Sequence, residues 1–182
     1  MLGLLAAFGL AAATGLNAYL PLLIVGLLAR YTDLLALKAP WSALTHPVVL
    51  IVIGVLLAIE VTVDKIPAVD TVNDVIQTLF RPAAGAILFA ASGNAISNVS
   101  PVLAMVCGLL IAGGVHTAKA VARPAVTAGT AGVGNPVVSL AEDALSGITT
   151  VVAVVAPVLL GLLLLLAIWL FIRWYHHRRS RA

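Results

Sequence analysis

The sequence predicts an all-α fold: a polytopic bundle of about five transmembrane helices, with short amphipathic or re-entrant helices between them. Of the 182 residues, 62% are hydrophobic and 9% are charged, and the mean hydropathy is +1.15. A soluble domain has about 25% charged residues, and a small one needs polar groups over most of its surface. The composition therefore excludes a soluble globular enzyme, a nucleic-acid-binding domain and a disordered chain. It predicts an integral membrane protein that has the lipid bilayer as a partner and no nucleic-acid partner.

The first apolar run is longer than one membrane crossing needs. No charge lies between Leu2 and Ala29, a stretch of about 42 Å as a helix, against a hydrocarbon core of about 30 Å. Gly15, Asn17 and Pro21 fall in its middle. Because proline removes a backbone donor and clashes with the preceding turn, we expect a kinked or locally unwound helix there. No Lys or Arg precedes the run, so we expect it to be a retained span.

Polar connections divide the rest of the chain into four further spans. Asp70, Asp74 and Thr78 share one helix face at i, i+4 spacing, which predicts a short amphipathic helix before the third span. The last apolar stretch exceeds one crossing, so we expect a short helix bearing Glu142 and Asp143 ahead of the final span. The predicted segments are a connection over 30–46, a span over 47–63, the amphipathic helix over 66–80, spans over 80–96 and 101–121, a flexible or re-entrant linker over 124–135, and a span over 148–172.

These spans form one predicted transmembrane domain, 1–172, followed by a basic tail, 173–182. Four arginines lie in that tail: Arg173, Arg178, Arg179 and Arg181. Positive charge beside a span favours the cytoplasmic side, where we expect the tail to lie.

Two short echoes suggest an inverted repeat. Thr-Gly-Leu-Asn at 14–17 resembles Gly-Gly-Val-His at 113–116, and Thr-His-Pro-Val-Val at 45–49 resembles Gly-Asn-Pro-Val-Val at 134–138. If 1–65 and 101–172 are copies, the central span 80–97 inverts one of them, as in many transporters. The alternative is chance similarity in a chain rich in Ala, Val and Gly.

The ionisable residues form two clusters beside apolar spans. The first holds Glu60, Asp64, Lys65, Asp70, Asp74 and Arg81, and the second holds Lys119, Arg123, Glu142 and Asp143. Charges at membrane depth tend to pair inside the protein. The simplest arrangement brings the Glu60/Asp64 face against the Lys119/Arg123 face, and its two excess carboxylates would hold a cation or relay protons. The alternative is that these residues mark water-exposed span ends, with Lys and Arg reaching to the interface.

Three further polar residues are candidates, and two of them have both a structural and a functional interpretation. Asn17 either bonds a freed backbone carbonyl or coordinates substrate where the helix opens. His116 is either a helix–helix hydrogen bond or a proton carrier. Asn135 is expected as the N-cap of the helix bearing Glu142, with Pro136 at its first position.

No motif assigns catalytic residues or a cofactor. Asp64, Asp70 and Asp74 are similar to the metal-binding aspartates of lipid-headgroup transferases, but the Gly-containing spacing of those enzymes is missing. Metal binding is therefore left open. Cys107 is the single cysteine, and we expect it to be a packing residue.

Five segments together resemble a bacterial membrane family, domain of unknown function 4126, over about residues 3–170. They are 15–22, 64–70, 81–85, 116–119 and 135–143, and the most specific are Asp-Lys-Ile-Pro at 64–67 and Ser-Leu-Ala-Glu-Asp at 139–143. The resemblance implies a polytopic protein of the bacterial inner membrane and supplies no activity. It also implies that a basic residue is common where this chain has Asn17, so the charge of the site differs here.

The favoured function is a small transporter- or channel-like protein for a small solute or ion, working as a homodimer because five spans barely enclose a path. The alternatives are a non-catalytic scaffold or lipid-associated protein, and a lipid-modifying enzyme. The candidate substrate- or ion-binding residues are Asn17, Glu60, Asp64, Lys65, Asp70, Asp74, Arg81, His116, Lys119, Arg123, Asn135, Glu142 and Asp143.

Overall fold

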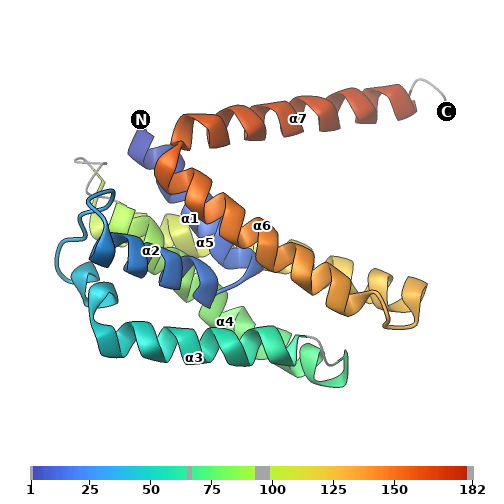
Figure 1. The fold of residues 1–182 in the computed structure, drawn as a ribbon. Helices are drawn as coiled ribbons and strands as arrows, with labels where there is room; N and C mark the ends of the chain where they lie inside the picture. The colour runs from blue at the N-terminus through green and yellow to red at the C-terminus, as the bar shows by residue number, and fades with distance from the viewer. Residues whose placement is uncertain (1, 65–66, 93–98, 180–182) are drawn as a thin grey trace.

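The computed structural model describes residues 2–64, 67–92 and 99–179, and within these ranges it is all-helical, as predicted (Figure 1). The elements are α1 (Leu2–Leu16), α2 (Tyr19–Tyr31), the short 3-10 helix η1 (Trp41–Thr45), α3 (Pro47–Val63), α4 (Pro67–Ala91), α5 (Pro101–Thr130), α6 (Asn135–Val155) and α7 (Pro157–Arg179). No strand lies in the described ranges. The predicted Lys65 lies outside them, and of Asp70 only the backbone is described.

Two of the helices, α5 and α6, are long and apolar enough to cross a membrane. α1, α2, α3 and the first part of α7 are apolar but shorter. Length and composition therefore support two spans where five were predicted, and of these two only α5 begins at a predicted span, that over 101–121.

The exterior of the molecule is apolar and its interior holds charges. Along α3, the exposed large hydrophobic side chains are Val48, Ile51, Val52, Val55 and Ile59, whereas Glu60 is 1% exposed. On α4, Arg81 is 0% exposed. Soluble proteins show the opposite distribution, and large exposed apolar surfaces mark contact with a membrane or a partner.

The helices pack around α1, α4 and α5. α4 and α5 share the most extensive contact, and α1 packs against both of them and against α6. α3 runs beside α2 along the lower edge of the view, while α7 extends away from the bundle and touches α1 and α6 near its own start (Figure 1).

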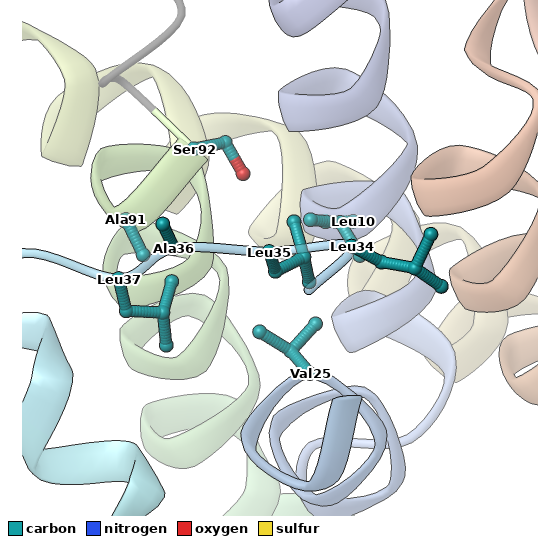
Figure 2. Close-up of a pocket in the computed structure, with 8 residues that line it drawn as sticks. All are labelled: Leu10, Val25, Leu34, Leu35, Ala36, Leu37, Ala91 and Ser92. Atoms are coloured by element: carbon teal, nitrogen blue, oxygen red, sulfur yellow. The ribbon is translucent and has the colours of Figure 1, made fainter. Parts of the chain in front are cut away.

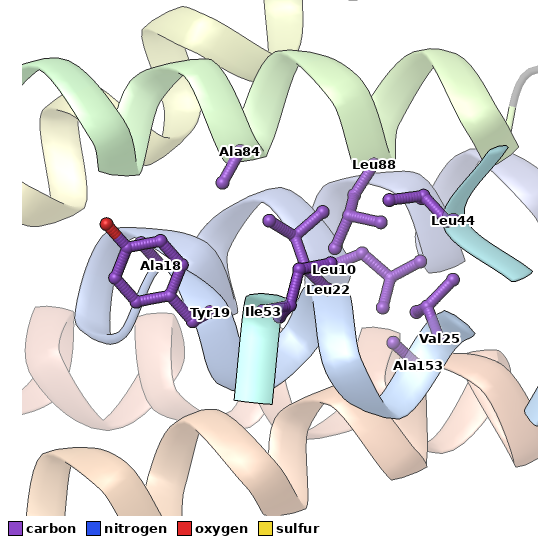
Figure 3. Close-up of a cluster of buried hydrophobic side chains, with 10 residues drawn as sticks. All are labelled: Leu10, Ala18, Tyr19, Leu22, Val25, Leu44, Ile53, Ala84, Leu88 and Ala153. Atoms are coloured by element: carbon purple, nitrogen blue, oxygen red, sulfur yellow. The ribbon is translucent and has the colours of Figure 1, made fainter. Parts of the chain in front are cut away.

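Small residues allow these helices to approach closely. A side-chain carbon on Gly108 would collide with the Gly85 carbonyl oxygen and would lie 2.6 Å from the Phe89 Cβ. Such stripes of Gly and Ala are typical of helix packing in membranes. Larger apolar side chains fill the space between α1, α2, α3 and α4, as Figure 3 shows for Leu10, Leu22, Ile53 and Leu88.

Two sequence predictions agree with the observed boundaries. The first apolar run is interrupted between Leu16 and Tyr19, where a break was expected. α3 spans the predicted residues, because the His46 ring Nδ1 accepts from the Val48 backbone N–H and Pro47 stands at the first helical position.

Three other boundary predictions are wrong. The amphipathic helix and the third span are one helix, α4, which passes through Pro82, and α5 passes through Pro124 into the predicted linker. A proline removes one helical hydrogen bond, and packing along the rest of each helix outweighs that loss. The helix bearing Glu142 also runs on past residue 148 and ends at Val155, because Ala156 precedes a proline and such a residue disfavours helical geometry.

The connection between α5 and α6 is a tight turn over 131–134. Ala131 and Gly132 adopt left-handed backbone angles, with φ of 51° and 84°. Their N–H groups both donate to the Thr127 carbonyl oxygen, which ends α5.

Two further expectations change, one about the basic tail and one about the inverted repeat. The predicted tail is helical up to Arg179, because α7 continues that far. In the first echo, Asn17 lies in the break between α1 and α2, whereas His116 lies inside α5. These two positions therefore have different local structures, and this echo does not reflect a shared fold.

Candidate functional site in a buried ionic network

The two predicted clusters of charge meet inside the helix bundle. Seven described side chains form ion pairs there, and together we call them the buried ionic network. They are Glu60 and Asp64 from the end of α3, Asp74 and Arg81 from α4, Lys119 and Arg123 from α5, and Glu142 from α6. The members that belong to one helix are spaced so that they lie on the same face of it. The packing of the four helices brings these faces together.

Arg81 is the centre of the first half of the network. Its Nη2 lies 3.1 Å from Glu60 Oε1, and its Nη1 lies 3.4 Å from Asp74 Oδ1. Nη1 is also 3.0 Å from Nδ1 of His116. The guanidinium therefore bridges α3, α4 and α5.

This contact with Arg81 fixes the tautomer of His116. A guanidinium has only donors, so Nδ1 accepts and the ring proton lies on Nε2. Nε2 is 3.1 Å from Thr78 Oγ1, which in turn donates to the Asp74 carbonyl oxygen at 2.9 Å. His116 is therefore neutral in this arrangement and adds no charge to the network.

Glu142 is the centre of the second half. Its Oε2 lies 2.9 Å from Lys119 Nζ and 3.0 Å from Arg123 Nη2. Asp64 joins the halves, because its Oδ2 is 3.9 Å from a nitrogen of each of the three basic side chains of the network. Its Oδ1 accepts from Asn73 Nδ2 at 2.7 Å.

The break between α1 and α2 opens onto the network. The Leu16 carbonyl, at the end of α1, accepts from Lys119 Nζ at 3.2 Å. Asn17 Oδ1 accepts from the backbone N–H groups of Tyr19 and Leu20, and Asn17 Nδ2 donates to Asp143 Oδ1 at 2.9 Å. The negative end of one half-helix thus faces a cation, and the start of the next is tied to an acid, which suits the helix dipoles. Asn17 was expected either to bond a freed carbonyl or to coordinate substrate. Its side chain bonds freed N–H groups and Asp143, and Lys119 donates to the freed Leu16 carbonyl.

We expect Asn17→Ala to lower the free energy of unfolding by about 1–2 kcal/mol, because alanine provides no cap for α2. Asn17→Ser retains a capping oxygen and loses the contact with Asp143, so its effect should be smaller. Thermal unfolding of both variants in detergent, followed by circular dichroism, measures the difference. If Asn17→Ala is as stable as wild type, the break does not depend on this side chain.

The described acids of the site outnumber its bases by two. The carboxylates are Glu60, Asp64, Asp74, Glu142 and Asp143, and the bases are Arg81, Lys119 and Arg123. The excess equals that predicted from sequence, although Lys65 and the Asp70 side chain are not described. Such an excess, carried by side chains that are buried or only partly exposed, favours the binding of a cation or a proton.

Asn135 lies outside the network, and its predicted role as an N-cap is wrong. The N-cap of α6 is Gly134, whose N–H donates to Thr130 Oγ1. Asn135 is the first residue of α6, and its Oδ1 accepts from Thr127 Oγ1 at 3.1 Å. It therefore fastens the start of α6 to the end of α5.

Three residues near the network, Tyr19, Asn73 and Gln77, were not among the predicted site residues. Gln77 is 2% exposed and its Oε1 has no hydrogen-bond partner, as is also true of Glu60 Oε2. The spacing contains a signal for it, because Gln77 lies three residues after Asp74 and four before Arg81, on the same face of α4.

The described residues include no group of three or more His, Cys, Asp or Glu side chains placed to hold a metal ion. Asp64 and Asp74, two of the three aspartates considered for a metal, face guanidinium and ammonium groups instead.

A separate pocket of about 280 Å³ lies near the other end of α4 (Figure 2). It is apolar apart from Ser92, whose hydroxyl donates to the Leu88 carbonyl oxygen. With no charge in its lining, it offers no chemistry comparable to that of the network.

Comparison with curated proteins and with solved structures yields no match. A family model does match, over residues 4–177, and its description is domain of unknown function (DUF4126). The match covers nearly the whole chain and includes every member of the buried ionic network. The protein therefore belongs to the DUF4126 family.

Proposed function

We propose that this protein is a transporter- or channel-like membrane protein that moves a small solute or ion by way of the buried ionic network. The observation that supports it is the burial of charged side chains next to a broken helix, beneath an apolar exterior. Ionisable residues inside a membrane protein usually mark substrate or ion pathways. Half-helix ends directed at charges are a recurrent feature of transporter binding sites.

Charge balance supports an ionic substrate or coupling ion. Two uncompensated negative charges in a low-dielectric interior are unfavourable, and a cation or proton that enters the site relieves them. The ion must also be able to leave, so the site must not hold too much negative charge. The three basic side chains offset most of the charge of the acids and so allow release.

The membrane placement is part of the proposal. We place the chain as a multi-pass protein in the bacterial inner membrane, with its C-terminal arginines in the cytoplasm. We also propose a homodimer, because the helices of one chain enclose little space for a path.

The test is ion flux in proteoliposomes. Purified protein is reconstituted, and the entry of protons, Na⁺ or K⁺ is followed with dyes under an imposed gradient. We expect flux well above that of protein-free vesicles, and a loss of at least tenfold in Glu60→Gln, because the network then lacks one ionisable carboxylate. Asp33→Asn is the matched control, since it removes an exposed carboxylate in the loop after α2.

Flux equal to that of protein-free vesicles for all three ions would refute transport of these ions. Flux that is unchanged in Glu60→Gln would show that the network is not the path. Size-exclusion chromatography of each variant establishes that it is folded.

A structural scaffold is the second candidate, because every base of the network contacts acids on other helices. In that case the network only locks the helices together. Glu60→Gln would then lower thermal stability, and neither a pH gradient nor added ions would change flux.

A further inference from the structure

The two oxygens of the Glu60 carboxylate have different surroundings. Oε1 accepts from Arg81 Nη2 at 3.1 Å. Oε2 has no hydrogen-bond partner, and the residue is 1% exposed. Leaving a buried charged acceptor without a donor is strongly unfavourable, so this oxygen is a place where the structure needs a hydrogen.

A second buried acceptor without a donor lies on α4. Gln77 Oε1 is buried and has no partner, and Gln77 is one helical turn before Arg81, which holds Glu60. The Tyr19 phenol interacts with the Gln77 side chain and with the charges of Glu60 and Arg81. Two lone acceptors therefore belong to one group of side chains, built from α2, α3 and α4.

The charges around Glu60 leave room for one more positive charge. Arg81 on α4 and Lys119 on α5 face it as cations, Asp64 faces it as an anion one turn later on α3, and Tyr19 faces it from α2. His116, behind Arg81, is neutral, because its Nδ1 accepts from the guanidinium. The described acids of the whole site still exceed its bases by two.

We propose that Glu60 binds a proton on Oε2 and donates it in a hydrogen bond to Gln77 Oε1, and that this proton is the ion the protein moves or couples to. The proposal rests on the proposed transport function and names its ion. Protonation forms the O–H bond of a neutral carboxylic acid and changes the excess charge of the described site from −2 to −1. Release breaks that bond, restores the carboxylate and strengthens its pairing with Arg81.

A proton suits this position better than a metal ion does. A metal at Oε2 would need several oxygen ligands and would lie close to the Arg81 guanidinium, which repels it. A proton needs one covalent partner and one acceptor, and Glu60 and Gln77 provide both.

Infrared difference spectroscopy of the full-length protein in liposomes tests the proposal without any transport assay. A spectrum at low pH minus one at high pH contains the C=O stretch of each carboxylic acid formed. We expect a band that is lost in Glu60→Gln and retained in Asp33→Asn. In Gln77→Leu the band should persist at a higher frequency, because the acid has lost its acceptor.

A difference spectrum of Glu60→Gln that retains every band of the wild-type spectrum would overturn the proposal. If Glu60→Gln does not fold, Gln77→Leu decides, because an unshifted band would show that the titrating acid is elsewhere. A titrating Glu60 band in a protein without flux would refute transport and leave the proton site standing. Flux of Na⁺ or K⁺ in a protein without a Glu60 band would support transport and refute the proton site.

Discussion

Replacing Arg81 with alanine is expected to lower the free energy of unfolding by about 3–5 kcal/mol, the range found when one partner of a buried ion pair is removed. Arg81 is 0% exposed and lies within 4 Å of Glu60, Asp64 and Asp74. Without the guanidinium, these buried acids lose a shared partner and repel one another. Unfolding in detergent with increasing denaturant measures the change.

Two other variants show whether the effect comes from charge, geometry or simple loss of an arginine. Arg81→Lys keeps one positive charge but cannot form the same fork of hydrogen bonds, so we expect an intermediate loss. Arg30→Ala removes an exposed arginine at the end of α2 that donates to the Thr45 carbonyl oxygen, and it should cost about 1 kcal/mol or less. Equal losses in Arg81→Ala and Arg30→Ala would contradict a central role for Arg81.

The second large effect is expected where α4 and α5 touch. Gly108→Ala should destabilise the fold by about 1–3 kcal/mol, because its new methyl group meets the Gly85 backbone, which cannot move without separating the helices. Gly114→Ala, one and a half turns later on the same helix, meets nothing within 4 Å. That variant should be neutral or more stable by up to about 1 kcal/mol, since alanine favours the helix.

The pair of glycine variants is measured by thermal unfolding under identical detergent conditions. Because both change Gly to Ala on α5, differences in helix propensity largely cancel. A Gly108→Ala protein as stable as Gly114→Ala would show that the contact between α4 and α5 is looser than the structure indicates.

The sequence was informative wherever a local signal decides the structure. The polar connection over 30–46 predicted where α3 begins, and the group Gly15, Asn17 and Pro21 predicted the break between α1 and α2. It was misleading at Pro82 and Pro124, where packing against neighbouring helices carries the helix past the proline. Pro157 was the local signal for the break at Ala156, and the prediction placed that break too early.

The meeting of the two charged clusters was predictable, but the partners within it were not. Spacing showed that Glu60 and Asp64 share a face, and that Lys119 and Arg123 share another. It did not show that Glu60 pairs with Arg81 while Lys119 pairs with Glu142, because that depends on how the helices rotate against one another. The burial of Gln77 Oε1 without a hydrogen-bond partner depends on the same rotation.

The contact between Asn17 and Asp143 joins residues 126 positions apart. At a ribosomal rate of about 5–20 residues per second, Asn17 is made about 6–25 s before its partner exists. Lys119 and Arg123 likewise precede Glu142 in synthesis. The pairing of charges across the bundle is therefore complete only after α6, which carries Glu142 and Asp143, has been made.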